Sequence, residues 1–162
     1  MTASTESVRA TREQLLDRCR PVKIQVAGRT TKARGRTQMA AIITQQHAAP
    51  TTLTKTAHWI APTPTIAHLW ATAIAIRHVE KRGGHHIELT TPATRIARLL
   101  CGDHSTAFAH QDADLLAGWL TYLLTGLNVT GRQTALKDLP ELAQALAATS
   151  AGGRAEQTTL AV

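Results

Sequence analysis

The sequence contains no aspartate or glutamate from residue 18 to residue 79. An enzyme that holds a divalent cation needs acidic side chains as ligands, because magnesium strongly prefers oxygen donors. The stretch is long enough to hold several core strands and a helix, and none of them can supply a carboxylate. This part of the chain therefore argues against metal-dependent hydrolysis.

Aromatic residues and cysteines are also scarce. Aromatics make up 3% of the 162 residues, so few rings are available for stacking on nucleic-acid bases. Cys19 and Cys101 have no metal-ligand spacing; reduced thiols are expected, with a disulfide between the two as the alternative. An apolar run long enough to cross a membrane and an N-terminal signal peptide are both missing. We therefore expect a cytoplasmic protein with no membrane partner and no cofactor.

Positive charge is abundant and unevenly distributed. Residues 1–36 hold nine Lys and Arg against three acids, a balance of +6, whereas the other 126 residues hold nine against eight, a balance of +1. A basic segment of this kind attracts phosphates and is typical of nucleic-acid-binding proteins. The plainer interpretation, solubility or attraction to any acidic surface, has equal weight.

The length fits one domain. We expect an N-terminal extension over residues 1–20, ended by Pro21, a folded domain over residues 21–149 and a disordered tail over residues 150–162. No internal repeat or interdomain linker interrupts the domain.

Apolar periodicity and turn residues predict five strands and four helices in this domain. The strands are expected over residues 22–26, 39–44, 53–60, 86–90 and 127–130, and the helices over residues 64–83, 92–102, 112–126 and 140–149. Strands that follow closely pair as antiparallel hairpins, whereas strands separated by helices pair in parallel. The prediction is an α/β fold with a mixed five-stranded sheet, three antiparallel then two parallel strands, and flanking helices.

This element order resembles the ribonuclease H family over about residues 22–148. Where the family has a hydrophobic-Asp-Gly segment, the chain has Val26-Ala27-Gly28. The alanine-rich first helix reads Ala67-His68-Leu69-Trp70-Ala71-Thr72-Ala73, with His68 where the family carries a Glu. The fourth strand runs through Leu89-Thr90-Thr91-Pro92-Ala93, and the last helix begins Pro140-Glu141-Leu142-Ala143.

The resemblance implies a metal site that this chain has lost. Family members hold two divalent ions between clustered carboxylates. The matching positions here are Ala27, His68, Pro92 and Pro140, and none of them supplies an anionic oxygen. The resemblance therefore implies a pseudoenzyme with no catalytic or metal-binding residues. Each residue also has a plain structural explanation, since proline suits the first turn of a helix and alanine suits a packed strand end.

The strongest binding candidate is the segment from residue 29 to residue 36, expected to be a hairpin loop. Arg29, Lys32, Arg34 and Arg36 carry four positive charges there, among threonines and glycines suited to phosphate contacts. A solvated hairpin loop without a partner is the alternative. Arg95, Arg98, Arg132 and Lys137 extend the basic surface only if the fold places them on the same face.

Two further hypotheses belong to other classes. The third domain helix is unusually apolar, with Leu115, Leu116, Trp119, Tyr122 and Leu123, which predicts core packing with an edge left for a homodimer or a protein partner. The second hypothesis is an unrelated enzyme activity based on His68 and a histidine-rich loop. His104, His110, Asp112 and Asp114 are spaced loosely enough to meet around a metal, but chance clusters are expected among eight histidines.

Overall fold

The structure is a computed structural model that describes residues 20–46, 48–103, 108 and 110–151. The elements in chain order are β1 (Val22–Thr31), η1 (Lys32–Arg34), β2 (Arg36–Thr44), β3 (Thr51–Ala57), α2 (Pro64–Lys81), β4 (His86–Thr91), α3 (Thr94–Leu100), α4 (Gln111–Leu124), β5 (Asn128–Gln133), η2 (Leu136–Asp138) and α5 (Pro140–Ala151). The expected N-terminal extension up to residue 19 and the tail beyond Ala151 lie outside the described residues.

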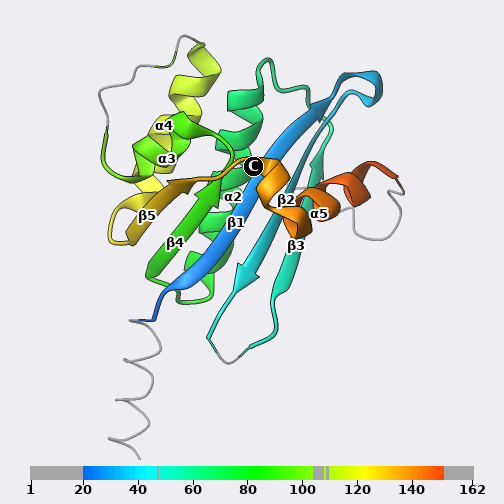
Figure 1. Cartoon of the computed structure of the whole chain (residues 1–162). Coiled ribbons are helices and arrows are strands. Elements are labelled where there is room, and N and C mark those ends of the chain that lie inside the picture. The colour runs from blue at the N-terminus through cyan, green and yellow to red at the C-terminus, as the bar shows by residue number, and fades with distance from the viewer. Residues whose placement is uncertain (1–19, 47, 104–107, 109, 152–162) are drawn as a thin grey trace, which may run out of the picture.

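The sheet has the strand order β3-β2-β1-β4-β5 (Figure 1). The pairs β1–β2 and β2–β3 are antiparallel, and the pairs β1–β4 and β4–β5 are parallel. The parallel pairs follow from the helical connections, because α2 and then α3 with α4 return the chain to the starting end of the sheet. The predicted mixed sheet, with three antiparallel strands followed by two parallel ones, is confirmed.

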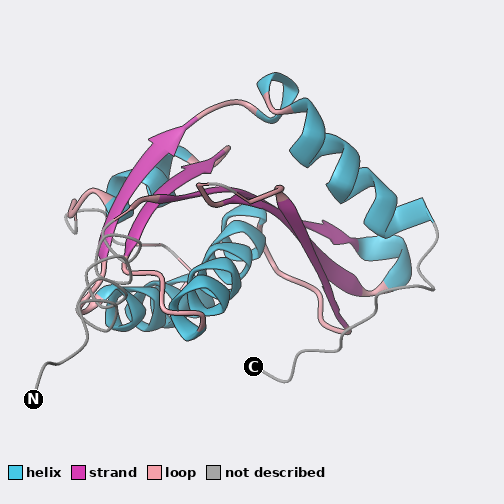
Figure 2. Cartoon of the chain, turned by 90° about the horizontal axis from the view of Figure 1, so that it is seen from below, coloured by secondary structure: helices cyan, strands magenta, loops and turns pink. Residues whose placement is uncertain are grey.

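Helices cover both faces of the sheet. The helices α2, α3 and α4 pack on one face, and α5 lies alone on the other (Figure 2). The larger core is formed by α2 against the sheet, and it holds the fully buried Ile66, Leu69 and Trp70. A smaller core joins α5 to Ala27 of β1 and to Ala40 and Ile42 of β2. No helix of the described part is long and apolar enough to cross a bilayer.

The hairpin loop expected over residues 29–36 is wrong for half of these residues, which lie in strands. The strand β1 continues through Arg29 to Thr31, and β2 already begins at Arg36. Thr30 pairs with Thr37 across the hairpin, and β-branched residues favour a pleated, half-buried strand. Only η1 and the positive-φ Gly35 turn the chain. The basic segment is therefore the end of a rigid two-stranded ribbon.

The residues before three of the helices determine where each helix begins. Thr91 ends β4 and accepts a hydrogen bond from the amide of Ala93, so α3 begins at Thr94, two residues later than expected. His110 caps α4, because its Nδ1 accepts from the amide of Asp112 at 3.1 Å. Asp138 lies in η2, before α5 begins at Pro140.

Gly28 sets the distance between β1 and α2. A Cβ atom built at Gly28 would lie 2.7 Å from the carbonyl carbon of Ala67 and 3.1 Å from the Cβ of Ala71. Real Cβ atoms do not approach backbone atoms this closely, and the backbone of Ala67 belongs to a helix that cannot yield locally. The helix therefore rests directly on the backbone of the strand at this point.

We predict that Gly28→Ala lowers the free energy of unfolding by about 3 kcal/mol or more, because the added methyl group forces β1 and α2 apart. Urea unfolding followed by circular dichroism measures the change. Gly102→Ala is the matched control: Gly102 has a φ of +91° and open space around it, so it should lose only about 1 kcal/mol from backbone strain. Equal losses in the two variants would contradict the close approach of helix and strand as the cause.

Candidate functional site

Four positions singled out in the sequence lie around the carboxyl end of β1. The parallel pairing of β1 with β4 ends at Gln25↔Thr90, and two residues further along each strand come Ala27 and Pro92. Ala27 packs in the smaller core with Leu139, the residue before Pro140. His68 reaches the same strand from α2. We call Ala27, His68, Pro92 and Pro140 the sheet-end cluster.

His68 is fixed by a hydrogen bond to the backbone of β1. The amide of Gly28 donates to Nδ1 of His68 over 3.1 Å. A neutral imidazole that accepts at Nδ1 carries its proton on Nε2. Burial lowers the pKa of His68 below its ordinary value of 6.5, since the charged form would lose its water. His68 therefore joins α2 to β1 as a neutral side chain.

The sheet-end cluster does not fit a magnesium site. Ala27 is 1% exposed and surrounded by apolar side chains, the two prolines offer no side-chain donor, and Nδ1 of His68 is already bonded. Magnesium requires oxygen ligands in near-octahedral geometry. Across the described ranges, no three His, Cys, Asp or Glu side chains gather in a way that could hold a metal ion.

Three acids lie in the neighbourhood of the cluster. Asp138 and Glu141 flank the start of α5, and Glu88 lies on β4; all three are exposed. Glu88 precedes Pro92 by four residues, which is about 13 Å along an extended strand. Asp138 and Glu141 lie beside Pro140 only. Their positions are those of surface and helix-end residues.

The β1–β2 hairpin holds the predicted nucleic-acid-binding residues, which differ in how far their side chains are exposed to solvent. Arg34 in η1 is exposed, and Arg36 at the start of β2 is half-buried. Lys32 opens η1 beside them in the chain. Arg29 is half-buried, and its Nη2 donates to the carbonyl of Leu146 in α5 over 2.8 Å. Burial lowers the pKa of Arg29 below its ordinary range, and the guanidinium remains charged at neutral pH.

The same ribbon holds the end of α5. Gln38, 1% exposed on β2, donates from Nε2 to the carbonyl of Thr149 over 2.9 Å. The last carbonyls of a helix have no partner within the helix, and a cation near them also interacts favourably with the helix dipole. Arg29 and Gln38 thus stabilise the C-terminal turns of α5. No local signal in the sequence indicates this role, because the contacts span 117 and 111 residues.

Thr37 fixes the segment that leads into α2. Its Oγ1 donates to the carbonyl of Trp59 over 2.6 Å and accepts from the amide of Ala61 over 3.0 Å. Thr37 is fully buried, so these two bonds satisfy its hydroxyl. They hold the β3–α2 connection against the hairpin, which places the first turn of α2 and His68 beside β1.

The other basic residues do not all share the hairpin's side of the molecule. Arg95 and Arg98 are on α3, across the molecule from the hairpin in Figure 1, and the guanidinium of Arg95 stacks over the Phe108 ring at 5.3 Å. Arg132 is on β5, and Lys137 is in η2 close to the start of α5. His104, part of the loose histidine and aspartate group, lies outside the described residues. Its described members, His110, Asp112 and Asp114, lie at the N-terminal end of α4, where Asp114 accepts a hydrogen bond from the amide of Phe108.

Neither protein-family models nor curated proteins match this chain. Several solved structures are similar to it. Ribonuclease H1 from the halophilic archaeon Halobacterium salinarum superposes with a TM-score of 0.63 at 17% identity, covering 78% of this chain and 93% of that one. The N-terminal RNase H domain of rv2228c from Mycobacterium tuberculosis gives a TM-score of 0.66 at 12% identity, covering 83% and 99%. LC11-RNase H1 in complex with an RNA/DNA hybrid superposes with a TM-score of 0.64 at 11% identity, covering 78% of this chain and 94% of that one.

These similarities show that the chain has the ribonuclease H-like fold, as its element order predicted. At such identities they show the fold alone. What the chain does with this fold has to be argued from its own residues.

We predict that the chain loses stability as the pH falls below 6.5, in part through His68. The unfolded state binds a proton at His68 near pH 6.5, whereas the folded state binds it only at lower pH, so acid favours unfolding between these two values. His68→Asn keeps an acceptor for the Gly28 amide but does not titrate. Urea midpoints measured between pH 7.5 and 5 should fall less steeply in this variant.

His78 also has a lowered pKa, from desolvation first and then from Arg82 and Lys55, but it is present in both proteins and cancels in the difference. Identical pH profiles for the wild type and His68→Asn would show that His68 is not held neutral by the fold.

Proposed function

We propose that this chain is a ribonuclease H-like domain that binds nucleic acid through its basic β1–β2 hairpin without cleaving it. The observation that carries the proposal is the ribbon end itself, where Lys32, Arg34 and Arg36 follow one another within five residues in a region without any carboxylate. Phosphate contacts dominate the affinity of nucleic-acid binders and need only positive charge in a fixed place.

The structure of the hairpin favours such contacts. Its backbone is held by the β1–β2 ladder, and its base is bonded to α5 through Arg29 and Gln38. A rigid ribbon loses little conformational entropy when its tip meets a phosphate backbone. Arg34 and Arg36, with Lys32, would contact phosphates, whereas Arg29 keeps the ribbon in place on α5.

The hairpin tip and the sheet-end cluster lie on the same strand. Thr31 is four residues beyond Ala27, about 13 Å along an extended chain. A nucleic acid bound at the tip can therefore run past the position where members of the family hold their metal ions. With Ala27, His68, Pro92 and Pro140 there, no carboxylate is available to activate water, so the bound strand would stay intact.

One of the similar structures supports the class of ligand. LC11-RNase H1 was solved with an RNA/DNA hybrid, which shows that this fold can hold a nucleic-acid duplex. We therefore propose a nucleic acid as the ligand of this chain, and binding measurements decide among DNA, RNA and an RNA/DNA hybrid.

We predict that Arg34→Ala with Arg36→Ala weakens binding of labelled nucleic acid and flattens its salt dependence. Removing one cation that neutralises a phosphate should reduce the slope of log affinity against log salt by about one unit. Adding Lys32→Ala should lower the affinity and the salt slope further. Arg29 is kept in all variants, because its removal would also break the bond to Leu146. Fluorescence anisotropy across a salt series measures both quantities.

The matched control is Arg82→Ala with Arg98→Ala, which removes two exposed cations that lie outside the hairpin. This variant should keep the wild-type slope within error. If both double variants weaken binding equally, net charge rather than the hairpin is responsible. If neither does, the hairpin is not the binding site.

A second prediction concerns the sheet-end cluster. We predict that Ala27→Asp, His68→Glu, Pro92→Asp and Pro140→Asp together create a magnesium site, because these positions match the carboxylates of the family in the sequence. Magnesium at ten times its dissociation constant should then stabilise the protein by about 1.4 kcal/mol. Thermal unfolding with and without magnesium at constant ionic strength measures this effect.

The isosteric control carries Asn, Gln, Asn and Asn at the same four positions, and magnesium should leave its unfolding temperature unchanged. Equal responses in the acid and amide variants would mean that these positions do not correspond to a metal site. The wild type is expected to behave like the amide variant.

A further inference from the structure

The helix α4 exposes two large apolar side chains on its outer side. Ala113, Ala117 and Leu120 are buried against the core. On the opposite side, Leu115 is 66% exposed and Tyr122 is 75% exposed, next to the exposed polar residues Asp114 and Thr121. Exposed apolar side chains that lie close together can mark an interaction surface.

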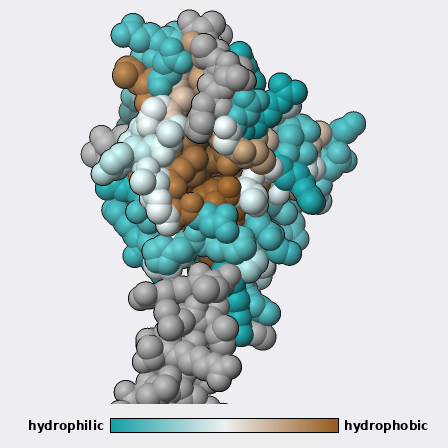
Figure 3. Space-filling model, turned by 90° about the vertical axis from the view of Figure 1, so that its left-hand side faces the viewer, coloured by the Kyte–Doolittle hydropathy of each residue, from teal (hydrophilic) through white to brown (hydrophobic). Residues whose placement is uncertain are grey.

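Three exposed residues and one half-buried residue share a face of α4. Leu115, Gly118 and Tyr122 are exposed, whereas Trp119 is half-buried and packs against the core. They recur at the spacing i, i+3, i+4 and i+7, over about 10 Å, the rise of seven helical residues. Figure 3 shows this side of the molecule; its strongly apolar hollow is not formed by Gly118, Trp119 or Tyr122, whose hydropathy is intermediate. We call these four residues the α4 stripe.

Gly118 lies at the centre of the α4 stripe and has nothing within 4 Å of the place where its Cβ would be. Within the helix, glycine costs about 1 kcal/mol relative to alanine. The fold of the single chain therefore gives no reason for a glycine here. A small residue at the centre of an apolar stripe allows another helix to approach closely.

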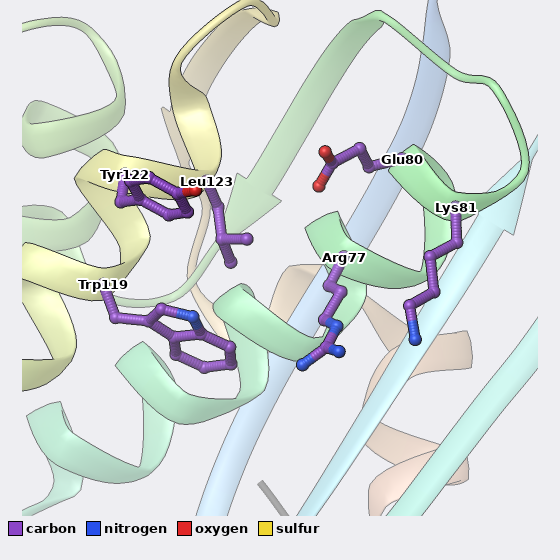
Figure 4. A pocket seen from close by; sticks show the side chains of 6 residues that line it. All are labelled: Arg77, Glu80, Lys81, Trp119, Tyr122 and Leu123. Carbon is purple, nitrogen blue, oxygen red and sulfur yellow. The ribbon is translucent and has the colours of Figure 1, made fainter.

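Charge is arranged unequally along α4. Asp112, with its side chain 51% exposed, lies at the N-terminal end. At the other end, Trp119, Tyr122 and Leu123 line a pocket together with Arg77, Glu80 and Lys81 of α2. Figure 4 shows the apolar side chains of α4 on one side of this pocket and the charged side chains of α2 on the other. The α2 residues leave one net positive charge there.

We propose that the α4 stripe binds the α4 stripe of a second copy of this chain, with the two helices antiparallel about a two-fold axis near Gly118. In this arrangement Leu115 of each copy lies against Tyr122 of the other, because the two residues are three and four positions on either side of Gly118. The proposal stands on α4 alone and does not depend on nucleic-acid binding by the hairpin.

Charge complementarity selects the antiparallel orientation. Asp112 is six residues before Gly118 and seven before Trp119, so it lies on the flank of α4 that borders α2. A two-fold axis perpendicular to the helices places this flank of one copy beside the same flank of the other, with the direction reversed. Asp112 then faces Arg77 and Lys81 of the second copy.

Light scattering on the purified, nuclease-treated chain tests the proposal. The expected molar mass is twice the 17.4 kDa of the chain, and it should persist at high salt because most of the contact is apolar. Gly118→Phe should give the mass of one chain. Its circular dichroism and unfolding temperature in dilute solution should stay unchanged, because the new ring projects into open space.

A charge exchange tests the orientation. Asp112→Lys should weaken the dimer, and adding Arg77→Glu with Lys81→Glu should restore it at least partly. A wild-type mass of one chain would overturn the proposal and would also be the result if another segment or another protein covers the stripe. A dimer that Gly118→Phe leaves intact would place the interface elsewhere. A weakened dimer that the charge exchange does not rescue would overturn the antiparallel orientation.

Discussion

The close contact between β1 and the first turns of α2 positions the rest of the site. Gly28 lets the helix rest on the strand, and its amide bonds to His68 from that helix. Because α2 cannot move away, its N-terminus stays beside the end of β1, where Pro92 and the start of α5 also arrive. Thr37 supports the contact by holding the β3–α2 connection against the hairpin. The contact between α2 and β1 thus fixes His68 beside the strand and places the surrounding residues.

Apolar packing and one hydrogen bond stabilise this end of the molecule. Here Ala27 extends the small core under α5, and a neutral His68 bonds to the strand. The positive charge is placed further along β1 and β2, in a ribbon whose base is bonded to the end of α5. Structural stability and charge are therefore separated along the same two strands.

The sequence predicts the sheet and the helix order, because apolar alternation, helix periodicity and proline positions are local signals. It fails at the hairpin, where it predicts a loop over Arg29 and Thr30; cross-strand pairing with Thr37 and Gln38 decides that region, and such pairing has no local signature. The roles of Arg29 and Gln38 on α5 depend on contacts more than 100 residues away in the chain. Gly28 can be noticed in the sequence, but only the position of α2 shows why a side chain is excluded there.

Binding without cleavage is the central property proposed for this chain, and the most direct measurement tests both parts together. The purified chain is titrated against labelled duplex DNA, RNA and an RNA/DNA hybrid across a salt series with magnesium, and the same samples are then run on a denaturing gel. We expect binding that weakens with salt and strands that remain intact. Cleavage by the wild type, or no binding to any of the three at low salt, would contradict this function.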